Sequence, residues 1–335
     1  MSIGYAIMLA VVKMKKLIID QNNENQRIDK YLKKLLCKAP SSLVYKMLRK
    51  KDVKVNGKRV KENHILHLGD EVSLFLYDDK FKEYTSPLTI HDLPITFDVV
   101  YEDEHILIVN KPAGLLVQPD INEDMNTLSN QVLTYLYQKG EYDPEADLGF
   151  TPGPVHRLDR NTSGLVMFGK DMRALQDLNE MMKKRHCIEK TYRTIVKGYV
   201  KDQELIDYVI KDEKEMKMHI VPSTTPNSLK MHTKVHALIS TKDYSLIEVG
   251  LVTGRTHQIR VHLSSINHPL MGDKKYGDFE WNKQIKKEFH LNSQLLHAYS
   301  LSFVNPIGSM KYMKGKTITC QVPQKFKEIQ EKYFK

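Results

Sequence analysis

Apolar residues recur at two different spacings along the N-terminal part of the chain. Between residues 28 and 36, and again between 43 and 48, they return every three or four positions, which is typical of helices with one buried face. Between residues 53 and 76 short apolar runs alternate with polar ones, and Asn56-Gly57 has the composition of a tight hairpin turn. This part is predicted to be a small α/β module, with two helices followed by short strands.

The pattern changes after a polar segment. Residues 79–93 contain Pro87 and few apolar positions, which is typical of a linker. Strand-like runs then predominate, and they lie at residues 95–100, 105–109, 165–168, 190–196, 233–239, 245–251 and 295–304. Helical spacing returns at residues 128–136, 175–182, 259–266 and 324–333. The larger part of the chain is therefore predicted to be an α+β domain.

These patterns divide the chain into four parts: an extension (1–13), the N-terminal module (14–78), the linker (79–93) and the large domain (94–335). Met14-Lys15-Lys16 is a more plausible natural start than Met1, so we expect residues 1–13 to be a disordered extension or the product of a misplaced gene start. The apolar run 5–12 is short and no basic stretch precedes it, so a secretory signal is not expected. The chain has no run of eighteen apolar residues, so we expect no transmembrane helix and no membrane partner.

The positive charge of the chain is concentrated in one window. The net charge is +10, and residues 27–61 contain thirteen Lys or Arg against two acidic residues, so the remainder is near neutral. A polyanionic partner would explain this distribution, although charge alone is also compatible with a solvated basic face. The three cysteines are far apart and form neither a disulfide framework nor a CxxC site, so we expect a reducing, cytoplasmic location.

The segment 153–165 has the most chemically suggestive composition. If it is extended, Arg157 and Asp159 point to one face and Leu158 to the other. For this triplet alone a structural ion pair is the more ordinary interpretation. A tight turn is expected at residues 162–164, before the apolar run that follows.

Four strings change the interpretation. His-Arg-Leu-Asp-Arg-Asn-Thr-Ser-Gly-Leu (156–165) closely resembles the signature of the RluA-type pseudouridine synthases, although many members have Asp where this chain has Asn161. Lys-Thr-Tyr (190–192) and Gly-Arg-Thr-His-Gln-Ile-Arg (254–260) are similar to two further motifs of that family, in the same order and at similar spacing. Asn-Lys-Pro-Ala-Gly (110–114) is also similar to a string near the start of its catalytic domain.

The resemblance implies an isomerase with an aspartate nucleophile. It makes Asp159 the nucleophile, places the ring of Tyr192 against the target base, and pairs Arg255 with Asp159. The residues that it implies for substrate binding are His156, Arg157, Arg160 and Leu263. It also implies a largely antiparallel mixed sheet that is flanked by helices and split by an active-site cleft.

No cofactor is expected, because the isomerisation of uridine to pseudouridine oxidises nothing and releases no group. No metal is expected either. His257 and His262 are five residues apart, so they do not share a helix face, and no Cys or Glu completes a site with them.

The basic N-terminal module resembles the S4 RNA-binding domain. The matching strings are Arg-Ile-Asp-Lys-Tyr-Leu (27–32) and Val-Lys-Val-Asn-Gly-Lys (53–58). Basic side chains neutralise phosphates and give affinity with little sequence reading, so we expect RNA binding that weakens with salt. The residues expected to contact RNA are Arg27, Lys30, Lys46, Arg49, Lys50, Lys51, Lys54, Lys58 and Arg59.

Among the family, the resemblance favours members that act on large-subunit ribosomal RNA, with a transfer RNA as the alternative. A non-catalytic RNA-binding or ribosome-assembly factor would need only the S4-like module and a cleft. A hydrolytic RNA glycosylase would use similar groups but would release free uracil. The expected oligomeric state is a monomer.

Overall fold

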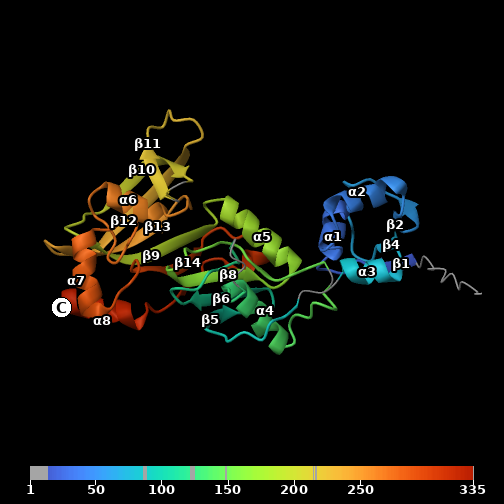
Figure 1. Cartoon of the computed structure of the whole chain (residues 1–335), viewed down its shortest axis with the longest axis horizontal. Coiled ribbons are helices and arrows are strands. Elements are labelled where there is room, and N and C mark those ends of the chain that lie inside the picture. The colour runs from blue at the N-terminus through green and yellow to red at the C-terminus, as the bar shows by residue number, and fades with distance from the viewer. Residues whose placement is uncertain are drawn as a thin grey trace, which may run out of the picture. The chain divides into compact units, whose positions relative to one another are not determined.

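The computed structural model describes residues 14–85, 89–120, 125–147, 149–213, 215 and 217–334 (Figure 1). The extension expected at residues 1–13 lies outside them. The chain forms two compact units. The first contains residues up to 92 together with 133–152 and 171–173, and the second contains 93–132, 153–170 and the residues from 174 onward. The boundaries expected at residues 78 and 94 remain a prediction.

The first unit contains the two helices and the short strands expected from the sequence. Helices α1 (Ile28–Leu35) and α2 (Ser41–Lys50) bury their apolar faces in one core. The strands β1 (Met14–Ile18), β2 (Val53–Val55), β3 (Lys58–Arg59) and β4 (Glu71–Phe75) form an antiparallel sheet in the order β1-β4-β2-β3. Asn56 and Gly57 both have positive φ, which is the conformation of the expected hairpin turn between β2 and β3.

A helix occupies the first part of the expected linker. Helix α3 (Asp78–Tyr84) packs Phe81 and Tyr84 against the core of the N-terminal unit. These residues are three apart and therefore share one helix face. Only these two residues form the apolar face, and the other residues of the helix are charged. The segment therefore has the composition of a linker although it is helical.

The second unit is built on one large sheet. Among the described residues it has eleven strands, nine of them in the order β11-β10-β12-β13-β9-β14-β8-β6-β5, with β15 paired to β14 and β7 to β8. The strands are β5 (Asp98–Glu102), β6 (Ile106–Lys111), β7 (Gly153–Pro154), β8 (Ser163–Gly169), β9 (Ile188–Lys197), β10 (Gln203–Asp212), β11 (Lys217–Val221), β12 (Leu229–Ser240), β13 (Tyr244–Leu251), β14 (Leu296–Phe303) and β15 (Thr317–Thr319). Of these pairings only β14 with β8 is parallel, so the predicted α+β class with a largely antiparallel mixed sheet is confirmed.

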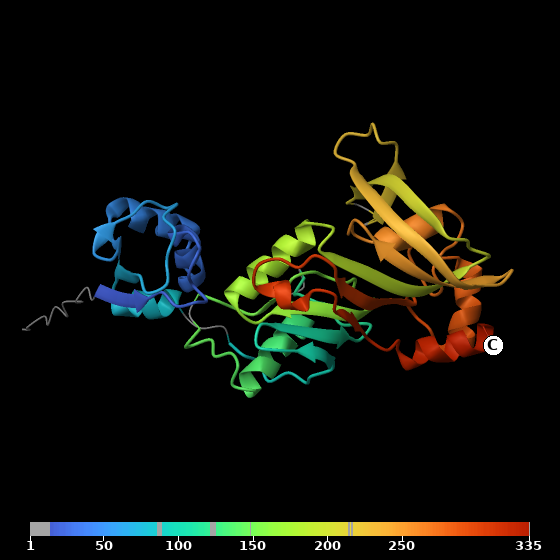
Figure 2. The same cartoon turned by 180° about the vertical axis from the view of Figure 1, so that it is seen from behind.

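Helices flank this sheet. Helix α5 (Met172–Lys183) packs Leu178 and Met181 on β6 and β8. Helices α7 (Phe279–Phe289) and α8 (Gln324–Tyr333) share a second apolar cluster and lie side by side near the C-terminus (Figures 1 and 2). The remaining helices are α4 (Leu128–Gln138), α6 (Gln258–Ser265) and the 3-10 helix η1 (Gly308–Met313). Among the described residues, no helix is long and apolar enough to cross a membrane.

Three strands meet at the point where the segment 153–165 joins the sheet. Ser163 and Gly164 pair with β14 at His297 and Ala298, and Ala298 also pairs with Tyr192 on β9. Gly164 has a φ of +112°, and a Cβ at this position would lie 2.3 Å from the carbonyl oxygen of Ala298. Glycine is therefore required there, and this close backbone contact holds the segment after Asp159 against β14, the strand that lies between it and β9 with Tyr192.

Candidate active site

A cleft of about 1020 Å³ opens in the second unit. It is lined by the loop 154–162, by Lys190 and Tyr192 on β9, and by residues 254–260 at the start of α6. Asp159 lies in this lining and is the one acidic residue among the described residues that form it. Seven lysines and arginines surround it: Arg157, Arg160, Lys183, Lys190, Arg185, Arg255 and Arg260. The cleft therefore has the charge to hold a phosphate-bearing chain around one carboxylate.

Arg260 is the arginine that pairs with Asp159. Its Nη1 donates to Asp159 Oδ2 at 2.9 Å, while its Nε and Nη2 donate to the two oxygens of Asp273 at 2.6 and 2.9 Å. The Asp273 side chain is fully buried, and 28% of the Asp159 side chain is exposed. The guanidinium thus bridges a deep carboxylate and one that faces the cleft.

The electrostatics of this bridge follow from burial and pairing. Burial works against the charge of Arg260, but the hydrogen bonds and charges of Asp273 and Asp159 hold its pKa above the usual range. Burial likewise works against the charge of Asp273, and the hydrogen bonds from Arg260 lower the pKa of that carboxyl group below its ordinary value. Arg260 and Asp273 therefore both stay charged, and Asp159 has a permanent cationic partner.

The expected pairing of Arg255 with Asp159 is wrong. The Nε of Arg255 donates instead to the backbone carbonyl of Lys230 at 3.3 Å, and its backbone N–H donates to Gln258 at 3.0 Å. Arg255 lies in the loop before α6, whereas Arg260 is inside the helix. The residues of α6 from 258 to 263 are all buried, so an arginine among them needs a buried partner. This burial is visible only in the structure, so the string 254–260 alone does not distinguish Arg260 from Arg255 as the partner of Asp159. The string 268–277, which contains Asp273, is also similar to the family, but the sequence does not show that its carboxylate reaches Arg260.

A fully buried lysine fixes the turn that bears Asp159. The Nζ of Lys111 donates to the carbonyl oxygens of Pro112, Leu115 and Arg160 at 2.9, 2.8 and 2.9 Å. Three acceptors match the three protons of an ammonium group. Burial lowers the pKa of Lys111 to about 7, and the charge of Asp159 opposes this shift. Lys111 thus joins the loop after β6 to the turn that contains Asp159.

The turn itself lies earlier than expected. The backbone N–H of Thr162 donates to the carbonyl of Asp159 at 3.0 Å, so the turn spans residues 159–162. Residues 163 and 164, which were expected to belong to it, are the first two residues of β8. The strand begins early because the parallel pairing with β14 starts at Ser163.

Tyr192 lies on β9 and lines the same cleft as Asp159. It is buried, and this burial raises the pKa of its hydroxyl group well above the usual range, with a further contribution from the charge of Asp159. The phenol is consequently neutral at physiological pH. It can offer its ring and a hydrogen bond, but it is a poor proton acceptor.

The four residues expected to bind substrate are placed differently from one another. Arg157 is exposed and lines the cleft together with Arg160. His156 also lines it, but its Nε2 accepts the backbone N–H of Met167, and burial lowers the pKa of its imidazole to about 3. Leu263 is fully buried within α6 and is not part of the lining, so the expectation that it contacts substrate is wrong. The spacing of Leu263 marks the core face of the helix.

In the N-terminal unit the basic residues expected to bind RNA are mostly exposed. Arg27 and Lys54 are half-buried. Arg27 donates to both oxygens of Asp29, and Lys54 lies 5.1 Å from the centre of the Phe75 ring. The exposed members are Lys30, Lys46, Arg49, Lys50, Lys51, Lys58 and Arg59. Their contact with RNA remains a prediction.

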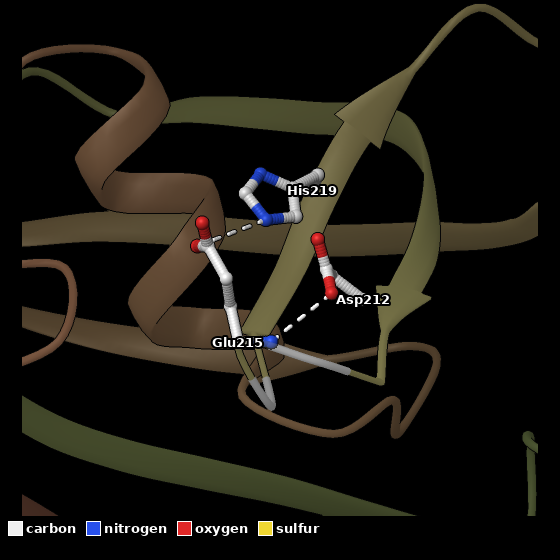
Figure 3. Close-up of side chains that lie close together, drawn as sticks. All are labelled: Asp212, Glu215 and His219. Carbon is white, nitrogen blue, oxygen red and sulfur yellow. Dashed lines mark hydrogen bonds and ion pairs between the residues drawn. The ribbon is translucent and has the colours of Figure 1, made fainter.

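One group of possible metal ligands stands at the end of the β10–β11 hairpin. Figure 3 shows Asp212, Glu215 and His219, whose ligand atoms lie within 4.8 Å of one another. Glu215 is exposed and already has an ion pair with Lys217 at 3.7 Å. The two histidines considered in the sequence have protein partners, since His257 contacts Tyr276 and His262 contacts Thr233. Asp212, Glu215 and His219 are not among the described residues that line the cleft.

Comparison with known proteins gives consistent matches. Residues 105–265 match the family described as RNA pseudouridylate synthase, and residues 26–72 match the S4 domain. The ribosomal large subunit pseudouridine synthase C of Buchnera aphidicola subsp. Baizongia pistaciae is 31% identical over 326 residues, which are 93% of this chain and 95% of the relative. The protein of the same name from Escherichia coli K12 is 32% identical over 88% of this chain and 89% of its own.

A solved structure, human RNA pseudouridylate synthase domain containing 4, is similar in fold. It has a TM-score of 0.55 and 21% identity, and the match covers 70% of this chain and 91% of that one.

Proposed function

Because the chain belongs to the RNA pseudouridylate synthase family, we propose that it isomerises uridines of large-subunit ribosomal RNA to pseudouridine, with Asp159 as the nucleophile. The observation that carries the proposal is the pairing of Asp159 with the buried guanidinium of Arg260, at 2.9 Å, inside a cleft rich in cations. A carboxylate can act as a nucleophile, and the guanidinium that donates to one of its oxygens holds it in a fixed orientation in the cleft.

The chemistry needs a carboxylate, a rotation of the base and no cofactor. The bond between N1 and C1′ breaks, the uracil turns in place, and C5 bonds to C1′. C5 then loses a proton and N1 gains one, so the product is an isomer of the substrate. The placement of Asp159 serves either attack at C1′ or removal of a proton from C2′ of the ribose. In both routes the hydrogen bond from Arg260 fixes the position of the carboxylate.

The target base must leave its stack before it can reach Asp159, which costs a few kcal/mol. We propose that Tyr192 packs its ring against the extruded uracil and that Arg157 contacts the base or fills the gap that it leaves. Arg255, which also lines the cleft, would contact the RNA backbone, while Arg260 forms the ion pair with Asp159. The basic side chains of the N-terminal unit would supply further phosphate contacts that offset the cost of extrusion.

The assignment to large-subunit ribosomal RNA rests on the relatives whose names state that substrate. Transfer RNA is the alternative within the same chemistry. We further propose that the protein acts as a monomer in the cytoplasm, where its RNA substrate is made.

The test is a map of pseudouridines by carbodiimide treatment and primer extension. Total RNA would come from a strain that lacks the gene, rescued with the wild-type protein or with Asp159→Asn. We expect stops that are missing in the deletion and restored only by the wild type, and their positions identify the RNA. An unchanged map, with a ribosome-assembly defect that both proteins rescue, would support the assembly-factor alternative. Release of free uracil from the RNA would indicate a glycosylase.

A further inference from the structure

His257 lines the cleft, but neither the string 254–260 nor the proposed mechanism gives it a role. It lines the cleft directly before α6, and its Nε2 lies 3.9 Å from Asp159 Oδ2. This distance is too long for a hydrogen bond. Its Nδ1 lies 2.9 Å from the hydroxyl group of Tyr276, on the opposite side of the ring. The imidazole is therefore fixed at one nitrogen and directs the other toward the carboxylate.

The partners of Tyr276 favour one of the two neutral forms of His257. The Tyr276 oxygen accepts the backbone N–H of Met218 at 2.8 Å. Its own hydrogen then needs an acceptor, and the acceptor that the described part of the chain gives it is His257 Nδ1. A neutral imidazole that accepts at Nδ1 carries its proton at Nε2. This arrangement favours the tautomer whose N–H is at Nε2, on the side of the ring that faces Asp159.

The electrostatic surroundings favour the neutral ring. Burial lowers the pKa of His257 and, although the charge of Asp159 opposes this, the nearby charges of Arg260 and Lys275 lower it further. A neutral donor does not compete with Arg260 for an ion pair with the carboxylate. It remains available to an uncharged or developing anionic group that enters the cleft.

The backbone of His257 is an independent observation. It has a φ of +54° and a ψ of 18° at the position before the first residue of α6. Residues at this position usually have extended backbone, and a non-glycine residue in the left-handed region is uncommon. Such conformations persist where the surrounding structure determines them, and they are concentrated at functional sites. Here the conformation places the imidazole between Tyr276 and Asp159.

We propose that His257 is a further catalytic residue, whose Nε2–H donates a hydrogen bond to the uracil of the reacting nucleotide as the N1–C1′ bond breaks. The inference rests on the proposed function. When that bond breaks, its electron pair stays on N1, and the ring shares the negative charge with its carbonyl oxygens. A fixed donor in a desolvated cleft stabilises this developing charge more than it stabilises the neutral base.

His257 transfers no proton in this step. Asp159 stabilises C1′, and when C5 bonds to C1′ the electron pair that held Asp159 returns to the carboxylate. C5 then loses its proton to water and N1 takes one from water. The imidazole ends as it began, and no oxidant or reductant is needed.

The experiment compares single-turnover rates at saturating enzyme, with ribosomal RNA from the deletion strain as substrate, and measures the Kd for the same RNA. For His257→Ala we expect a rate about 10²-fold lower, which is the usual cost of removing one fixed donor to a developing anion. The Kd should stay within about threefold of the wild type, because the hydrogen bond strengthens only as the bond breaks. His257→Gln, which keeps an N–H donor, should recover part of the rate.

Tyr276→Phe tests the orientation separately. Without the hydroxyl donor, the proton of His257 can reside at Nδ1, so we expect a slower single-turnover rate with an unchanged Kd. His236→Ala serves as the control, since His236 is an exposed histidine of β12 that pairs with Asp202 outside the cleft. It should behave as the wild type.

Two results would overturn the inference. One is a His257→Ala rate within about threefold of the wild type. The other is an equal loss of rate in His257→Ala and His257→Gln together with lower melting temperatures, which would indicate a structural role. Either result leaves the proposed function intact as long as the wild type forms pseudouridine and Asp159→Asn does not. A wild type that forms none would refute both.

Discussion

The string 254–260 contains two arginines, and replacing each with lysine tests which of them is the partner of Asp159. The resemblance implies Arg255, whereas the structure pairs Arg260 with Asp159. Arg260→Lys keeps a cation at the position that faces Asp159, and Arg255→Lys keeps one in the loop before α6. A lysine ammonium is a single point charge, whereas the guanidinium of Arg260 donates to Asp159 and Asp273 at once. The ammonium can satisfy one carboxylate well, and the fully buried Asp273 has the greater need of it.

The expected magnitude follows from the hydrogen bond that the substitution removes. If the ammonium stays with Asp273, Asp159 loses one charge-assisted hydrogen bond, which is worth about 1.5–3 kcal/mol. At about 1.36 kcal/mol for each factor of ten, the single-turnover rate of Arg260→Lys should fall by roughly 10- to 150-fold. Arg255→Lys loses a 3.3 Å bond to a backbone carbonyl near the surface, so its rate should stay within about fivefold.

The assay is single-turnover pseudouridine formation at saturating enzyme, with the Kd for RNA and the melting temperature measured on the same preparations. Lysine is preferred to alanine at position 260 because an unpaired Asp273 would cost about 3–5 kcal/mol and could unfold the protein. The reasoning is refuted if Arg260→Lys retains the wild-type rate while Arg255→Lys loses more than about tenfold. The arginine expected from the motif alone would then be the partner of Asp159.

Three further predictions concern the rest of the molecule. Lys111→Met should lower the rate without weakening RNA binding, because the turn that bears Asp159 loses the bond from Lys111 to the Arg160 carbonyl; an unchanged single-turnover rate would contradict this. Burial lowers the pKa of His297 to about 4, so between pH 6.5 and 4 the unfolded chain binds the extra proton and stability falls as the pH falls. His297→Gln should reduce this slope by up to about 1.36 kcal/mol per pH unit in urea unfolding, and an unaltered slope would refute the assignment. Replacing Lys50 and Lys51 with Gln should weaken RNA binding and flatten its salt dependence by about 0.9 in log–log slope for each phosphate that the protein no longer neutralises, and an unchanged slope would mean that other residues bind the phosphates.

Much of the fold could be predicted because hydrophobic spacing reports burial directly. The run 165–168 was expected to be a strand, and every residue of β8 is buried. Tyr192 is expected on a strand, and β9 contains it, in register with Ala298 and in the lining of the cleft that also contains Asp159. Helix α3 was missed because its buried face comprises only two apolar residues among charged ones.

The site was less predictable because spacing does not determine which side chain reaches which partner. Arg255 and Arg260 belong to the same string, and only the path of the chain before α6 decides that Arg260 faces Asp159. The resemblance implies that Leu263 contacts the substrate, yet its side chain is fully buried. Asp273 and Tyr276 lie more than a dozen residues beyond Arg260 and His257, and nothing in the local sequence links these pairs.

The depth of the Arg260–Asp273 pair is itself an argument for the role of Arg260. A buried ion pair contributes little net stability, because the desolvation of both ions offsets their attraction. Here the pair also leaves one N–H of the guanidinium directed at a carboxylate in the cleft, at 2.9 Å. A surface lysine could neutralise Asp159 without this cost, but it would be mobile and screened by water. Asp273 fixes the guanidinium from behind, so the cation that faces Asp159 is already in place before RNA enters, and no reorganisation is needed when charge develops at the reacting nucleotide.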